Sequence, residues 1–79
     1  MIQNKVIVER KRYDSNLDGS ITVTVGDTWR DVCGSVWEVI VILHDWVFVV
    51  LRESKSLWGI GSDSIWAPVS FVNCSLVAT

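Results

Sequence analysis

Histidine and cysteine are scarce in this sequence, which holds one His and two Cys among 79 residues. A zinc site takes about four nitrogen or sulfur ligands, more than one chain supplies. Cys33 and His44 flank the expected strand 36–43, and an eight-residue strand spans roughly 26 Å, so that strand keeps them apart. We therefore expect no cofactor and no enzymatic activity.

Two cysteines are too few for a disulfide framework. Cys33 and Cys74 could be bridged only from neighbouring strands, and two free, buried thiols are the favoured interpretation. The apolar run near the N-terminus is shorter than that of a secretory leader. A reducing, cytoplasmic location is therefore expected, in the host cell if the chain is phage-encoded.

Long hydrophobic runs and an excess of basic charge are also missing. The longest apolar region, residues 36–51, contains Glu38, His44 and Asp45, whereas a membrane span needs about 18 uninterrupted apolar residues. The net charge of −2 provides no general attraction for nucleic acid. We expect no membrane contact and consider nucleic acid an improbable partner. The alternative nucleic-acid-binding residues are Lys5, Arg10, Lys11 and Arg12.

Tryptophan, in contrast, is abundant, with five residues. Each ring buries about 150–250 Å², on the order of 4–6 kcal/mol as an upper bound. Domains are stable by only about 5–15 kcal/mol, so each ring belongs in a core or against a partner. We assign Trp37 and Trp46 to the core and Trp58 to a surface contact. The predicted protein-binding residues are Trp29, Trp58, Trp66 and Phe71.

Short β-branched and apolar runs recur along the chain, and helix periodicity of useful length is absent. Six or seven such runs predict an all-β fold, either a small SH3-like barrel or a two-layer sandwich of antiparallel strands. We expect a single domain, 1–79, made of an N-terminal hairpin, 1–25, and a barrel, 26–79. Strands are predicted at 5–12, 21–25, 28–32, 36–43, 46–53, 64–70 and 74–78, with one helical turn at 70–73.

The stretch DSNLDGS, residues 14–20, resembles the start of a calcium-binding loop. Asp14, Asn16 and Asp18 have the spacing of the first three oxygen ligands. The twelfth position should be a bidentate Glu but is Val25, and a strand pattern follows instead of a helix. A hairpin turn is the favoured interpretation, with a weak calcium site as the alternative.

The two strongest strands, 36–43 and 46–53, are apolar on both faces. Strict alternation places Val36, Glu38, Ile40 and Ile42 on one side of the first strand. In the second, Trp46, Phe48, Val50 and Arg52 share a side. A strand with one solvated face should alternate apolar and polar residues, so both faces need a cover. The N-terminal hairpin, a second copy and a foreign partner are the three candidates, with a homodimer favoured over a self-contained sandwich.

The stretch GDTWRDVCGSVWEVIVI resembles small uncharacterised bacteriophage proteins in which a GD-x-W opening precedes a turn and a W-E-V strand. Later in the chain, SIWAPVSFVN, residues 64–73, is similar to the fourth strand and short helical turn of SH3-like barrels. The resemblance covers about two-thirds of the chain and includes no catalytic signature. It implies an accessory protein that binds and modulates a host or viral protein.

These observations favour a non-enzymatic function in protein–protein interaction. The expected contact surface is the loop at 54–66, which carries Trp58 and Trp66, because rings on barrel loops form grooves for extended or Pro-rich peptides. A small nucleic-acid-binding barrel and an oligomeric virion component are the alternatives.

Overall fold

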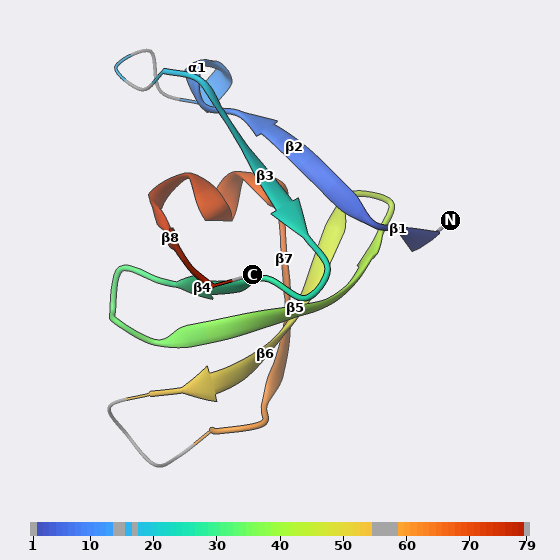
Figure 1. The fold of residues 1–79 in the computed structure, drawn as a ribbon, viewed down its shortest axis with the longest axis vertical. Helices are drawn as coiled ribbons and strands as arrows, with labels where there is room; N and C mark the ends of the chain where they lie inside the picture. The colour runs from blue at the N-terminus through green and yellow to red at the C-terminus, as the bar shows by residue number, and fades with distance from the viewer. Residues whose placement is uncertain (1, 14–15, 17, 55–58, 79) are drawn as a thin grey trace.

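The computed structural model describes residues 2–13, 16, 18–54 and 59–78. It consists mainly of antiparallel strands, arranged as a six-stranded sheet and a two-stranded sheet (Figure 1), so the all-β prediction is confirmed. The strands are β1 (Ile2–Gln3), β2 (Lys5–Glu9), β3 (Ser20–Thr24), β4 (Thr28–Arg30), β5 (Val36–Leu43), β6 (Trp46–Glu53), β7 (Asp63–Trp66) and β8 (Ser75–Ala78). The helical segments are α1 (Arg10–Tyr13) and the 3-10 helix η1 (Pro68–Asn73).

The larger sheet has the strand order β7-β6-β5-β4-β8, and β1 pairs with β5 outside this path. β7 and β8 therefore end this path, and β1 is also paired on one side only. Pro68 begins η1 instead of lying within the predicted strand 64–70, because proline cannot donate to a strand ladder and is suited to the first turn of a helix. η1 contains the predicted helical turn at 70–73 and leads directly into β8.

The predicted strand 5–12 is too long, since β2 ends at Glu9 and residues 10–13 form α1. The Arg-Lys-Arg sequence has no alternating apolar positions that would hold it in a sheet. β2 and β3 form an antiparallel hairpin whose inward residues, Val6, Val8, Ile21 and Val23, are buried. This hairpin lies over η1 (Figure 1) and contacts it from both strands.

β5 and β6 have the predicted bounds but not all of the predicted faces. In β6, alternation holds, and Val47, Val49 and Leu51 point into the core. In β5, the register with β6 shifts between Val39 and Val41. A bulge of this kind places two residues of one strand against one of the other. Val39 and Ile42 are consequently both buried, although strict alternation puts them on opposite faces.

Aromatic rings fill the space between the sheet and η1. Phe71, on η1, packs edge-on against Trp29 with ring centroids 5.4 Å apart. Trp66 lies 5.2 Å from Phe71 and 5.1 Å from Trp37, so the four rings form a continuous row. Such pairs add about 0.5–1.5 kcal/mol each beyond the area they bury. The row therefore fixes η1 against β4, β5 and β7.

The Gly26-Asp27 pair connects β3 to β4 and bonds to β5 beside the bulge. Gly26 has a φ of 99°, which glycine adopts without steric cost. Its N–H donates to the Val39 carbonyl at 2.8 Å, and the Val39 N–H donates to the Asp27 carbonyl at 2.9 Å. The buried Asp27 carboxylate accepts from the Thr24 N–H at 3.0 Å. This connection thus satisfies its own buried polar groups.

His44 and Asp45 form the two-residue turn between β5 and β6. Both have positive φ, 50° and 65°, as a type I′ hairpin turn requires, although neither is glycine. Gln3 holds the turn from β1. Its Nε2 donates to Asp45 Oδ1 and its Oε1 accepts from the Asp45 N–H, both at 2.7 Å. The N-terminal strand therefore fixes the hairpin turn.

Replacing His44 by Gly should stabilise the protein. A non-glycine residue in the left-handed region costs about 1–2 kcal/mol, whereas glycine adds about 0.5–1 kcal/mol of unfolded-state entropy. We expect His44→Gly to raise the melting temperature by about 4 °C, measured by circular dichroism.

Asp45→Gly is the matched control. It relieves the same strain but removes the side-chain bond to Gln3, which is worth about 0.5–1.5 kcal/mol. Its melting temperature should therefore change little. Equal stabilisation by both substitutions would contradict the role assigned to Gln3.

Candidate interaction surface

An apolar surface covers the solvent side of β5, β6, β7 and β1, and we call it the outer face. Residues directly opposite each other in paired strands share a face. The pairing places Ile2, Leu43 and Trp46 in one row across three strands. A second row contains Val41, Phe48 and Ile65. Ile40, at the bulge, completes the outer face.

The outer face is substantially exposed. The exposed fractions are 77% for Ile2, 57% for Ile65, 52% for Trp46 and 41% for Ile40. At roughly 180 Å² per large apolar side chain, these four alone expose on the order of 400 Å². The largest apolar patch of a soluble monomer is typically about 300–600 Å² and is often functional.

Two adjoining hollows give the outer face its shape. One, of about 470 Å³, is lined by Leu43, His44, Trp46, Phe48 and Ile65. The other, of about 400 Å³, is lined by Ile40, Phe48, Asp63, Ser64 and Ile65. Phe48 and Ile65 line both, so the two hollows adjoin at this pair.

Polar groups lie around the outer face. At the opposite end of β6 from the turn, Arg52 Nε contacts Glu38 Oε1 at 2.7 Å. Asp63 lies at the start of β7, and His44 lies in the turn. An apolar centre with a polar rim is the usual arrangement of a protein–protein interface.

The structure places the predicted protein-binding residues in different environments. Trp29 and Phe71 are only 3% and 0% exposed, which places them in the core instead of on a contact surface. Trp66 is half-buried within the aromatic row, and Trp58 lies outside the described residues. The assignment of Trp46 to the core is wrong, because its ring lies on the outer face. The period-two pattern of β6 already grouped Trp46 with Phe48, but it does not show which side is solvated.

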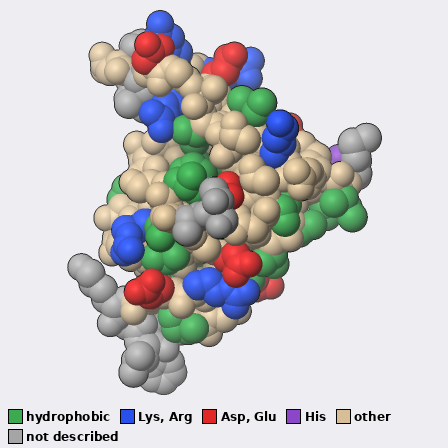
Figure 2. Space-filling view, viewed as in Figure 1, with side chains coloured by type: hydrophobic (Ala, Val, Ile, Leu, Met, Phe, Trp, Pro, Cys, Tyr) green, Lys and Arg blue, Asp and Glu red, His purple; other side chains and the backbone are tan. Residues whose placement is uncertain are grey.

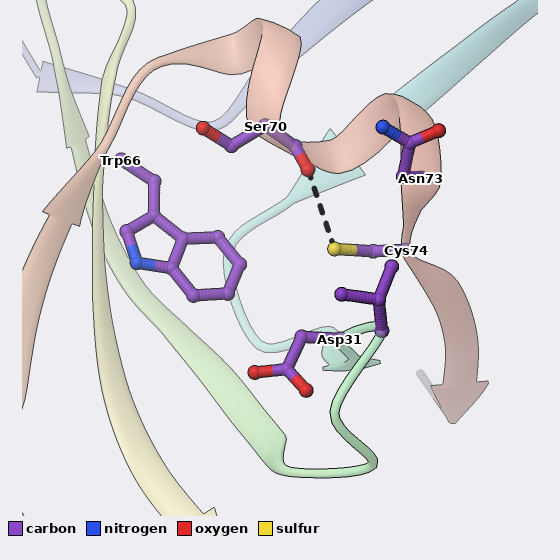
Figure 3. Close-up of a pocket in the computed structure, with 6 residues that line it drawn as sticks. Asp31, Trp66, Ser70, Asn73 and Cys74 are labelled. Atoms are coloured by element: carbon purple, nitrogen blue, oxygen red, sulfur yellow. Dashed lines mark hydrogen bonds between the residues drawn. The ribbon is translucent and has the colours of Figure 1, made fainter.

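A smaller hollow, of about 260 Å³, lies where η1 approaches the loop after β4. Figure 3 shows Trp66 beside it, Asp31 on the loop, and Ser70, Asn73 and Cys74 on η1 and its end. Cys74 Sγ donates to the Ser70 carbonyl at 3.3 Å. Burial, with the nearby Asp31 charge, raises the pKa of the Cys74 thiol and so disfavours the nucleophilic thiolate.

The Asp31 carboxylate accepts hydrogen bonds that hold its own loop. Its Oδ1 accepts from the Cys33 and Ser35 N–H groups at 2.9 and 3.0 Å, and its Oδ2 accepts from Trp37 Nε1 at 3.0 Å. Burial raises the pKa of this carboxyl, but the hydrogen bonds from Trp37 and from the backbone of residues 33–35 outweigh that effect and lower it. The hollow is therefore a structural feature and offers no activated nucleophile or base.

Both cysteines are free. Cys33 is exposed, which corrects the expectation that both thiols are buried, whereas Cys74 is half-buried. Exposure of Cys33 follows from its place in the loop between β4 and β5, where Asp31 binds the Cys33 backbone and leaves the side chain outside.

The alternative nucleic-acid-binding residues do not form a continuous basic surface. Lys5 begins β2, whereas Arg10, Lys11 and Arg12 lie on α1 at the other end of that strand. Lys11 Nζ lies 3.7 Å from Asp18 Oδ1. Figure 2 shows Lys and Arg interleaved with Asp and Glu around this end of the molecule.

The described residues do not support the alternative calcium site at residues 14–18. Asp14 lies outside the described residues, and Asp18 Oδ1 accepts from the Gly19 N–H at 2.8 Å, as in a turn. Gly19 has a φ of 78°. Among the described residues, no group of three or more His, Cys, Asp or Glu side chains is placed to hold a metal ion.

Comparison with protein-family models, curated proteins and solved structures found no match to this chain. Within the described part of the chain, no helix has both the length and the apolar character that crossing a bilayer requires.

Asp31→Asn should change how stability depends on pH. Because the folded-state pKa is lowered, the carboxylate stabilises the fold above its unfolded pKa of about 3.9, and this contribution is lost as pH falls through the folded pKa. We expect the variant to be less stable than the parent at pH 7 and the difference to shrink towards pH 2. Urea unfolding at several pH values measures this, and a constant difference would contradict it.

Trp46→Ser should destabilise the fold less than the loss of a core ring does, because half of the residue is already exposed. Phe71→Ala, its matched contrast in the core, should cost about 3–5 kcal/mol. Chemical unfolding of both variants measures the difference. Comparable losses would show that Trp46 supports the core instead of a surface.

Proposed function

We propose that this chain is a non-enzymatic protein that acts by binding another protein through its outer face. The observation that carries the proposal is the double row of apolar side chains across β1, β5, β6 and β7, with Trp46 and Ile65 more than half exposed. Burying about 400 Å² of such surface is worth on the order of 10 kcal/mol before the costs of association. Among the described residues, the buried core cluster contains no side chain of the outer face.

The composition of the outer face suits protein recognition better than chemistry or phosphate binding. All seven of its side chains are apolar, whereas phosphate contacts require polar or basic side chains or backbone donors. Trp is also the residue most enriched at the energetic centres of interfaces. Trp46 is therefore the expected anchor, a role that the sequence pattern assigned to Trp58 and Trp66.

Other features support a more specific setting. The strand order, with a 3-10 helix before the last strand, supports an SH3-like barrel preceded by the hairpin of β2 and β3. Two free thiols support a reducing, cytoplasmic location. The role of a bacteriophage accessory protein that modulates a host protein rests on sequence resemblance alone.

Site-specific photo-crosslinking tests the proposal. A benzophenone amino acid replaces Trp46 in one variant and Val77 in the other, and each is produced in cells and irradiated. Val77, on β8, is 46% exposed, and β4 separates its strand from the outer face, so it is the matched control. We expect discrete protein adducts from position 46 only. No adduct, or the same adducts from both positions, would overturn the proposal.

A further inference from the structure

We propose that the outer face binds a second copy of this chain, with Trp46 of each copy inserted into the hollow between Ile40, Phe48 and Ile65 of the other. This inference rests on the proposed function and names its partner.

The outer face has the self-complementary shape that a twofold interface needs. In such an interface the same surface meets itself, so a projecting group must find its hollow on an identical copy. Trp46 projects from the beginning of β6 with half of its surface exposed. The hollow beside Phe48, which is lined by Ile40, Phe48 and Ile65 together with Asp63 and Ser64, measures about 400 Å³. This volume is within the range of about 300–1,000 Å³ typical of ligand-holding clefts.

Charge also favours a second copy. A foreign partner selected by charge would need a charged anchor at the centre of the face, and every central side chain is apolar. Two identical copies bring their apolar rows together, and Asp63, at the start of β7, is the one charged residue that lines the hollow receiving Trp46. The ion pair between Glu38 and Arg52 is already satisfied within each copy and needs no partner.

The available area sets the expected strength. A standard interface buries about 800 Å² on each partner, and the four most exposed side chains provide on the order of 400 Å². The half-buried members of the two rows and the polar rim contribute the remainder. A single foreign strand added at the β7 edge would cover Ile65 but not Ile2, because β6 and β5 separate β7 from β1 and each strand adds about 4.8 Å. A folded copy covers the whole face, and we expect dimerisation in the micromolar range.

Sedimentation equilibrium of the purified chain over a range of concentrations tests the inference. We expect a reversible monomer–dimer equilibrium for the parent chain. Trp46→Lys should weaken it at least about tenfold, because it removes the anchor and buries a charge. Val77→Lys, the same kind of change on β8, should leave it unchanged.

Ile65→Trp distinguishes specific insertion of the Trp46 ring from non-specific hydrophobic association. The larger side chain adds apolar surface but occupies the hollow that receives the partner's ring. We expect weaker dimerisation, whereas non-specific hydrophobic association would become stronger and would overturn the inference. Circular dichroism confirms that each variant is folded, and Trp46→Ser replaces Trp46→Lys if the latter is not.

The remaining outcomes are also decisive. A parent chain that stays monomeric throughout the concentration range overturns the second copy as partner. If position 46 then still crosslinks to a different protein, the proposed function stands without the dimer. A dimer lost with Val77→Lys but kept with Trp46→Lys would place the interface at β8 and overturn the inference.

Discussion

Strand β6 is apolar on both of its faces, and the rest of the structure depends on which face is covered from within. Val47 and Val49 contribute to the interior, where they pack in one cluster with the hairpin of β2 and β3 and with the aromatic row. That packing commits Trp46 and Phe48 to the solvent side. The core and the candidate surface are thus two sides of one strand, eight residues long.

The sequence predicted the elements of this fold better than their exact arrangement. The bounds of β5 and β6 follow from dense β-branched runs separated by two residues, a pattern that few alternatives satisfy. The bulge at Ile40 has no comparable signal, since no glycine or proline marks it. It is imposed by pairing on both sides, with β6 along one edge and with Gly26 and Asp27 along the other. α1 was missed because its basic residues carry no apolar period.

The sequence predicted a surplus apolar face but not which residues would be exposed on it. Two-sided hydrophobicity indicated that one face would need a cover, yet periodicity alone cannot tell the inner side of a strand from the outer. The decision comes from residues distant in the chain, chiefly Phe71 on η1, which is fully buried against Trp29 and Trp66. Trp29, Trp66 and Phe71 looked like surface anchors because aromatic residues near loops serve either role. Only the packing of η1 against the sheet settles which role they have.

The attachment of Gln3 to the β5–β6 turn has a practical consequence for handling this protein. β1 joins the sheet beside Leu43, so any tag or fusion partner placed ahead of Ile2 would emerge at the border of the outer face. A bulky N-terminal fusion would therefore shield that surface sterically and could mimic a loss of binding. Extensions after β8 leave from a strand that β4 separates from β5, which makes the C-terminus the better position for a purification handle or an immobilisation tether.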